Sequence, residues 1–249
     1  MSKRELSGIY HRADLYDAIY RGRGKDYQAD SMAIAKHISE RNASAASLLD
    51  VACGTGSHLR HFAGLFAHVE GVDLAPDMVR LARENLPGVP VHEGDMSGFS
   101  LDGTFDAITC LFSSVGYLGD VARLDATLRC FAEHLNPGGV IVLEPWYFPD
   151  NATSGSVVGD LVTVGERTIS RVSHAVRREG AHHMEVHYLV ADRESGIQHF
   201  SDTHILSLFD RRQYESAFEK AGCAVEFLAP GESGSGPGLF VGTKPRSTG

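Results

Sequence analysis

Residues 47–62, SLLDVACGTGSHLRHF, place small and acidic residues at a spacing that suits ligand chemistry. Asp50, Ala52, Gly54 and Gly56 occupy every second position at the end of an apolar run. The run predicts a buried strand, and GSHLRHFAGLF predicts a helix after it. Small residues let a ligand approach the backbone, and a helix start offers free N–H groups. We therefore expect a ligand at the carboxyl end of this first strand.

Two further carboxylates stand where a nucleoside needs acceptors. Asp73, in EGVDLAP, comes 19 residues after Gly54 at the end of an expected second strand, where it can accept hydrogen bonds from both ribose hydroxyls. Asp95, in EGDM after a short third strand, can meet an adenine amino group, with the Met96 backbone beside it. These positions predict an adenosine-containing ligand.

The glycine pattern distinguishes between classes of nucleoside ligand. A dinucleotide fingerprint requires a third glycine, and Leu59 stands in its place. The pattern D-x-A-x-G-x-G instead resembles that of S-adenosylmethionine (SAM) methyltransferases, with Ala52 replacing their usual first glycine. A nicotinamide oxidoreductase, a turn that serves only packing, and a non-catalytic SAM-binding protein are the alternatives.

The elements around these residues predict an α/β fold. Helices at 10–21, 29–41 and 121–135, and another that Pro76 begins and Gly88 follows, alternate with five apolar strands. After Pro149, period-two alternation with glycine turns predicts an antiparallel meander of about four strands. A helix and two last strands follow. We expect one methyltransferase domain over 1–249, with a helical cap over 1–45 and a β insertion over 150–206 that covers the active site.

Composition excludes several functions. The net charge of −9 and an isoelectric point near 5.8 argue against nucleic-acid binding. No stretch approaches the roughly 20 apolar residues of a membrane span, and no signal peptide is evident. The four cysteines are scattered, which predicts buried free thiols and a cytoplasmic location. The 13 histidines match no standard zinc spacing, so we expect no metal.

The assembled motifs resemble one group of enzymes, the SAM-dependent N,N-dimethyltransferases of dTDP-linked amino sugars in antibiotic biosynthesis (desosamine and mycaminose type). The resemblance runs from about residue 14 to 242 and rests on LYDAIYRGRGKDY, FSSVGYL, EPWYFP, RVSHAVRREG, MEVHYLVAD and LFDRRQYESAFEKAG. It implies a class I SAM-methyltransferase fold: a Rossmann-like, seven-stranded, mostly parallel sheet with an antiparallel β-meander insertion. It also implies SAM as cofactor and a dTDP-linked aminodeoxysugar, 3-amino or 4-amino, as methyl acceptor.

The resemblance also assigns residues to the cofactor. Tyr16 and Tyr27 line the SAM pocket, and Arg23 or Lys25 neutralises the methionine carboxylate. Phe112 and Ser113, after the fourth strand, lie against the adenosine or the sulfonium. The full cofactor set is Tyr16, Arg23, Lys25, Tyr27, Ala52, Gly54, Gly56, Asp73, Leu74, Met78, Asp95, Met96, Phe112 and Ser113.

Tyr117 is the expected contact of the substrate amine, since this position faces the amine in the family. Some relatives carry His at the position of Tyr117. A second departure is Pro237, which replaces an Arg that in relatives could meet the nucleotide phosphates. We expect Tyr117 to orient the amine rather than deprotonate it, because a phenol with a pKa near 10 is a poor base at pH 7. The other expected substrate contacts are Trp146, Phe148, Arg171, Ser173 and one of the histidines His174, His187 and His204.

Rival methyl acceptors remain open at this point. Another small-molecule amine or hydroxyl would need the same cofactor site. A DNA adenine methyltransferase is disfavoured because EPWYFP follows the fifth strand rather than the fourth and the surface is acidic. The sequence leaves open which sugar is used, whether one or two methyl groups are transferred, and whether the protein is a monomer or a homodimer.

Overall fold

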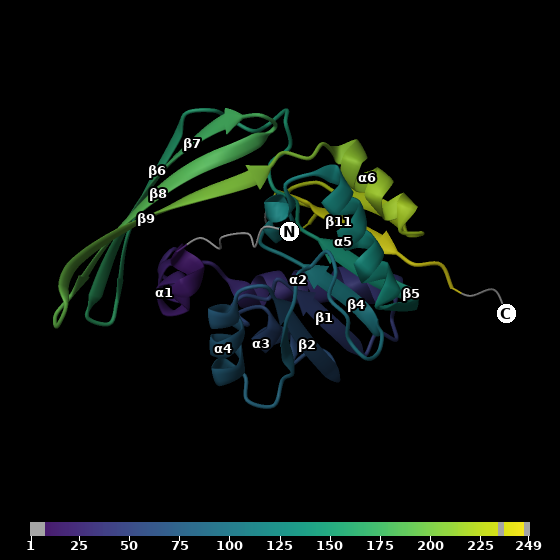
Figure 1. Cartoon of the computed structure of the whole chain (residues 1–249). Coiled ribbons are helices and arrows are strands. Elements are labelled where there is room, and N and C mark those ends of the chain that lie inside the picture. The colour runs from purple at the N-terminus through teal and green to yellow at the C-terminus, as the bar shows by residue number, and fades with distance from the viewer. Residues whose placement is uncertain (1–7, 234–236, 247–249) are drawn as a thin grey trace.

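A seven-stranded sheet forms the centre of the computed structural model, which describes residues 8–233 and 237–246 (Figure 1). Within this sheet, called the large sheet below, the strand order is β10-β11-β5-β4-β1-β2-β3, and β11 alone runs antiparallel to its neighbours. The strands are β1 (Ser47–Val51), β2 (His68–Asp73), β3 (Val91–Glu93), β4 (Phe105–Cys110), β5 (Leu135–Leu143), β10 (Ala224–Leu228) and β11 (Leu239–Thr243). The predicted mostly parallel fold is confirmed.

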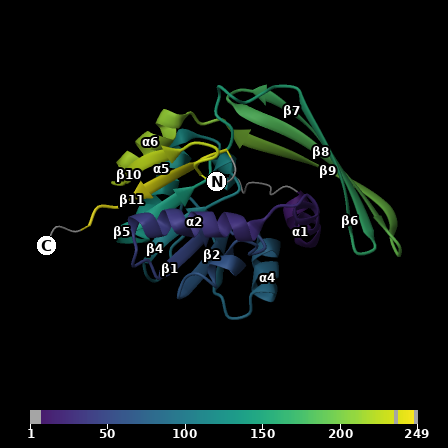
Figure 2. The same ribbon diagram turned by 180° about the vertical axis from the view of Figure 1, so that it is seen from behind.

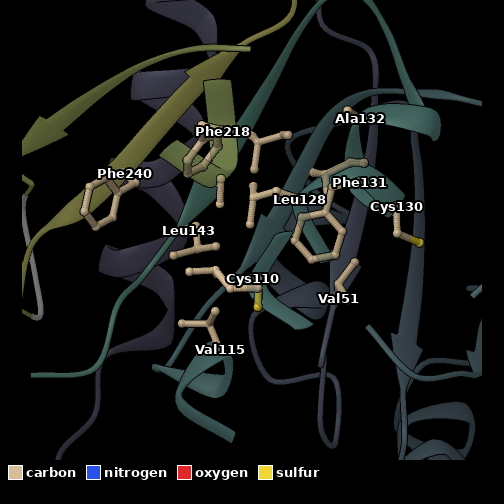
Figure 3. Close-up of a cluster of buried hydrophobic side chains, with 14 of the residues drawn as sticks. Val51, Cys110, Val115, Leu128, Cys130, Phe131, Ala132, Leu143, Phe218 and Phe240 are labelled. Atoms are coloured by element: carbon tan, nitrogen blue, oxygen red, sulfur yellow. The ribbon is translucent and has the colours of Figure 1, made fainter. Parts of the chain in front are cut away.

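Helices cover both faces of the large sheet because its strands are apolar on both sides. Leu48 of β1 packs toward α2 (Tyr27–Arg41), α3 (Leu59–Phe62) and α4 (Pro76–Asn85), whereas Leu49 packs toward α5 (Val121–Glu133) and α6 (Arg211–Lys220). Figure 2 shows the α2 face from behind. Figure 3 shows the opposite core, where Phe131 and Phe218 meet strand residues such as Leu143. Burying two apolar clusters fixes the strands that carry the candidate site.

The register brings the functional strand ends to one edge. Asp50 of β1 stands opposite Gly71 of β2 on one side and Thr109 of β4 on the other. The segments that follow β1, β2 and β4 therefore emerge side by side, as expected for a ligand site in an open parallel sheet.

A separate four-stranded antiparallel sheet, the small sheet, stands beside that edge (Figures 1 and 2). Its strands follow one another as a meander: β6 (Ser156–Val164), β7 (Arg167–Arg178), β8 (Ala181–Asp192) and β9 (Gly196–Ser207). The N-terminal segment packs on one face of it through η1 (Gly8–His11) and α1 (Ala13–Gly22). There Ile9, Leu15 and Ile19 meet Ile169 and Val186. The predicted meander is thus present, and its strands lie within residues 156–207.

Some boundaries differ from expectation. The helix expected over GSHLRHFAGLF is a single turn, α3, followed by turns. The helix expected to end at 135 ends at Glu133, and NPGG becomes part of β5 opposite an irregular register of β4. All four cysteines are buried free thiols, as predicted. In the described ranges, no helix is both long and apolar enough to cross a membrane. The start of the expected cap, residues 1–7, lies outside the described residues.

Candidate active site

One cavity of about 1010 Å³ lies where the edge of the large sheet, the small sheet and α1 meet. Of the residues predicted to bind ligands, it is lined by Tyr16, Arg23, Ala52, Gly54, Asp73, Leu74, Met78, Asp95, Met96, Phe112, Ser113, Tyr117, Trp146, Arg171 and Ser173. The cavity therefore unites segments from Tyr16 to Ser173, which are far apart in the chain.

The glycine turn after β1 opens toward this cavity. Ala52 and Gly54 both adopt a φ of 57°, in the left-handed region. A Cβ at Gly54 would meet no atom within 4 Å, so its missing side chain leaves open space beside the cavity-lining backbone. Glycine is required at position 56 for a different reason, which is packing. A Cβ there would come within 2.7 Å of Leu86 Cδ1, at the end of α4. Gly56 allows close packing and does not line the cavity.

Asp73 is held in place by the same turn. Its Oδ2 accepts from the Gly54 N–H at 2.8 Å and its Oδ1 accepts from the Ala75 N–H at 2.8 Å. Burial raises the pKa of Asp73, and the backbone N–H groups of Ala75 and Gly54 oppose that rise. A preorganised carboxylate beside a glycine with open space in front fits the ribose of an adenosyl ligand.

Asp95 carries a partner that the sequence did not predict. Arg123, in the first turn of α5, donates to Asp95 Oδ2 at 2.7 Å and to Oδ1 at 3.0 Å. Ser97 donates to Oδ1 from its N–H at 2.9 Å and from its hydroxyl at 2.7 Å. Burial acts to raise the pKa of Asp95, but the bonds from Ser97 and Arg123 outweigh it and lower the pKa. Asp95 is thus an ionised acceptor at the cavity wall, and Arg123 lines the cavity with it.

Phe112 and Ser113 form a strained backbone segment after β4. Their φ angles are 55° and 58°, a region that non-glycine residues occupy at a cost of about 1–3 kcal/mol each. Glu144, at the end of β5, accepts from the Phe112 N–H at 2.9 Å, and the Ser113 hydroxyl donates to the Pro145 carbonyl at 2.7 Å. Sequence reasoning missed Glu144. These two bonds stabilise the strained backbone at the point where β4 reaches the cavity.

The N-terminal cations separate into two positions. Arg23 lines the cavity and forms an ion pair of 3.3 Å with Asp160 of β6. Lys25 pairs with Asp30 and lies 5.2 Å from the centre of the Phe112 ring, behind the cavity lining. Tyr27 packs edge-on against His58 at 4.8 Å and does not line the cavity. Of the two cations predicted for the methionine carboxylate, Arg23 is the one at the cavity.

Aromatic and polar side chains gather at the small-sheet end of the cavity. Trp146 donates from Nε1 to His182 Nδ1 at 3.2 Å, and Arg171 donates to the Ser173 hydroxyl at 3.1 Å. Tyr117 bonds to Tyr10 at 2.9 Å and to His204 at 2.8 Å. Tyr10 and Tyr20 also line the cavity, but no glycine turn or acidic strand end marked them in the sequence.

Three predicted substrate residues lie away from the cavity. Phe148 is partly buried and packs against the core, with its ring centre 5.5 Å from that of Phe227. His174 points to the opposite face of β7 from Ser173 and is exposed. His187 is exposed, stacks on His199 at 5.1 Å and bonds to Glu185. The described part of the chain holds no group of three or more ligating side chains that could bind a metal.

The arrangement suits the binding and alignment of two ligands rather than covalent chemistry. The acidic acceptors Asp73 and Asp95 line the same cavity as Tyr117 and Trp146. Cys53, the cysteine of the glycine turn, is buried, which raises the pKa of its thiol and makes it a poor nucleophile.

Comparison with known proteins agrees with this arrangement. A family described as "Methyltransferase domain" matches residues 48–139. A dTDP-3-amino-3,4,6-trideoxy-alpha-D-glucopyranose N,N-dimethyltransferase of Streptomyces venezuelae is 50% identical, over 92% of this chain and 96% of its own. A dTDP-4-amino-2,3,4,6-tetradeoxy-D-glucose N,N-dimethyltransferase of Saccharopolyspora spinosa is 44% identical, over 96% of each chain.

A solved structure gives the same result for the fold. The SAM-bound structure of CalS10, an amino pentose methyltransferase from Micromonospora echinaspora, superposes with a TM-score of 0.85. It is 47% identical, and the match covers 92% of this chain and 96% of that one.

Proposed function

Because this chain belongs to the SAM-dependent N,N-dimethyltransferases of dTDP-linked amino sugars, we propose that it transfers two methyl groups from SAM to the amino group of one dTDP-linked aminodeoxysugar. The observation that carries the proposal is that one cavity is lined both by the glycine turn and by Tyr117. It provides room for a methyl donor and an acceptor at once, which an enzyme that transfers a group directly between two ligands requires.

The cofactor is SAM, and Asp73 and Gly54 are its proposed anchors. The Asp73 carboxylate accepts from the ribose hydroxyls, and the open space in front of Gly54 admits the ligand close to the backbone. Asp95 and the Met96 backbone hold the adenine, and Leu74 and Met78 contribute apolar contact. Arg23 faces the methionine carboxylate and exchanges part of its contact with Asp160 for it.

The acceptor occupies the end of the cavity between Tyr117 and the small sheet. Tyr117 contacts the amine, Trp146 gives the sugar or the base a flat apolar wall, and Arg171 and Ser173 contact polar oxygens of the nucleotide sugar. Alignment supplies most of the rate enhancement, since SAM provides a methyl group on an already activated sulfonium. The protein's task is to present a neutral amine with its lone pair toward that methyl group.

Mass spectrometry tests the proposed function directly. The enzyme is incubated with SAM and, in turn, dTDP-3-amino and dTDP-4-amino deoxysugars, and with the same sugars lacking the nucleotide. We expect one nucleotide sugar to gain first one and then two methyl groups, and the free sugars to react far more slowly. Turnover of a simple amine or a hydroxyl compound in preference to every nucleotide sugar would contradict the proposal. Sedimentation of the same samples decides between a monomer and a homodimer.

A further inference from the structure

Tyr117 stands between two hydrogen-bonding side chains from different parts of the chain. The Tyr10 hydroxyl, in η1, donates to the Tyr117 hydroxyl at 2.9 Å. Tyr117 lies in η2 (Ser114–Leu118), and its oxygen is 2.8 Å from His204 Nδ1 on β9. Because Tyr117 accepts from Tyr10, its own proton is available to His204, whose Nδ1 is then the acceptor. The three side chains form a directed chain, and two of its members, Tyr10 and Tyr117, line the cavity.

His204 is buried among charged and polar side chains that affect the stability of its protonated form. Its side chain is 5% exposed. Asp202, two residues away on the same face of β9, accepts from the backbone N–H groups of Gly8 and Ile9. Arg171 of β7 is a cation that acts on His204, and it lines a smaller cavity of about 40 Å³ together with His204, Tyr16, Tyr20 and Tyr188. The nearby Asp202 carboxylate and the Tyr117 hydroxyl can stabilise an imidazolium.

His204 is neutral in the resting protein. Burial lowers the pKa of His204, Asp202 opposes this, and Arg171 adds to the lowering. Near pH 7 the ring is therefore neutral and offers a lone pair at Nδ1, and its lowered pKa makes it a weaker base than an exposed imidazole. Burial raises the pKa of Tyr117 well above its ordinary value, so a free phenolate is not formed. The hydroxyl can pass a proton on only if it receives one in the same step.

We propose that His204 is the proton acceptor for the substrate amine, and that the Tyr117 hydroxyl carries the proton between them. The proposal rests on the proposed function, because it requires an amine at Tyr117. An ammonium N–H proton moves to Tyr117 Oη while the Tyr117 proton moves to His204 Nδ1. The products are a neutral amine, a neutral tyrosine and an imidazolium. No other reactant is needed, and the imidazolium releases its proton to solvent before the next methyl transfer.

The relay answers a requirement of the chemistry. A sugar amine is mostly protonated near neutral pH, and an ammonium has no lone pair with which to attack a methyl group. Each methyl transfer again leaves a positively charged nitrogen, so a second transfer requires a second loss of a proton. A buried acceptor one hydroxyl away removes that proton without placing a charged base against the sulfonium.

His204→Asn tests the relay with the full-length protein. An asparagine oxygen can still accept from Tyr117 near the Nδ1 position but cannot take the proton. Methyl transfer is measured in single turnovers with saturating SAM and nucleotide sugar across the pH range. We expect the variant to be roughly 100-fold slower at about pH 7, and within about threefold of the parent above about pH 9, where the amine deprotonates by itself. In a matching series with varied nucleotide sugar, the concentration that gives half of the maximal single-turnover rate should remain unchanged.

Two further variants make the result interpretable. Tyr117→Phe breaks the chain at its middle and should reproduce the same steep pH profile, and the double variant should be no slower than either single one. His199→Asn, on the exposed face of the same strand, should keep the parent profile. Binding of S-adenosylhomocysteine, measured by calorimetry, shows that each variant is folded.

The two possible failures are distinct. A His204→Asn enzyme with the parent pH profile, or one slowed equally at every pH, would overturn the relay while leaving the methyltransferase function intact. If the parent enzyme methylates no nucleotide sugar at any pH, the proposed function fails, and the relay fails with it.

Discussion

The Asp73 carboxylate and the Gly54 backbone N–H are joined by a hydrogen bond of 2.8 Å, which ties the end of β2 to the turn after β1. The bond spans 19 residues in the chain and connects adjacent parallel strands at their carboxyl ends. The acidic group and the open glycine are thus one unit.

Asp73→Asn should weaken the link between the end of β2 and the glycine turn. The amide would present N–H groups to one of the two backbone donors, Gly54 or Ala75, and would accept less strongly from a ribose. Since hydrogen bonds to charged groups are worth about 1.5–3 kcal/mol, we expect SAM to bind roughly 10- to 100-fold more weakly by calorimetry. Glu70→Gln is the matched control: Glu70 lies on the same strand but bonds to His68 and His92, away from the cavity. An equal loss of SAM affinity in both variants would contradict the assignment.

Gly54→Ala tests the open space beside the turn. Gly54 and Gly88 both have positive φ, 57° and 93°, and a Cβ at either meets nothing within 4 Å. Both alanine variants should therefore lose stability, by on the order of 1–2 kcal/mol, through backbone strain. Only Gly54 lines the cavity, so only Gly54→Ala should also weaken SAM binding, by more than roughly tenfold. If Gly54→Ala binds SAM with unchanged affinity while its Tm falls as in Gly88→Ala, the turn is not part of the cofactor site.

Asp50 makes the stability of the protein depend on pH. It is 2% exposed, and burial raises its pKa to about 7, although a bond from the Thr109 hydroxyl opposes the rise. The folded state therefore holds a proton that the unfolded state has released above about pH 4, so stability falls as the pH rises from there toward 7. Asp50→Asn removes this penalty. The Tm of the variant minus that of the parent should increase between about pH 5 and pH 8.

Asp106→Asn provides the contrast for that measurement. Burial acts to raise the pKa of Asp106, but bonds from Ala46, Asn136 and Ser47 outweigh it and lower the pKa. Asp106 is therefore ionised throughout this pH range, and its variant should be less stable by an amount that does not change with pH. If the Asp50→Asn difference is equally flat, Asp50 does not titrate in this range.

Phe148 and Trp146 should separate stability from substrate binding. Phe148→Ala removes a ring that packs against Phe227 and Phe240, and should cost about 2–4 kcal/mol of stability while the KM for the nucleotide sugar stays within about twofold. Trp146→Phe keeps most of the apolar surface but loses the bond to His182, and should raise that KM roughly tenfold. Thermal unfolding measures the loss of stability, and steady-state kinetics measures the KM of both variants. A raised KM with little loss of stability in Phe148→Ala would show that Phe148 contacts the substrate after all.

The sequence predicted the parts of the site that depend on local pattern. Asp73 and Gly54 could be placed because strand ends in a parallel sheet share one edge, and the spacing between them is short. Period-two alternation predicted the small sheet. The same alternation places His174 on the face of β7 opposite Arg171 and Ser173, so His174 could not join them in the pocket.

The parts that escaped prediction depend on how distant segments pack. Tyr117 and His204 are 87 residues apart and meet only because η2 lies against the last strand of the small sheet. Phe148 follows β5 as expected, but nothing local says that the chain turns its ring into the core. No local pattern in the sequence marks Arg123 or Glu144. Their roles follow from the fold, which places Arg123 beside Asp95 and Glu144 beside Phe112.

A crystal structure with S-adenosylhomocysteine and the methylated nucleotide sugar tests the central claim most directly. The account predicts the ribose hydroxyls at Asp73, the sugar nitrogen within hydrogen-bond distance of the Tyr117 hydroxyl, and the sulfur of the cofactor product facing that nitrogen. A sugar nitrogen bound elsewhere, with Tyr117 touching only Tyr10 and His204, would contradict it.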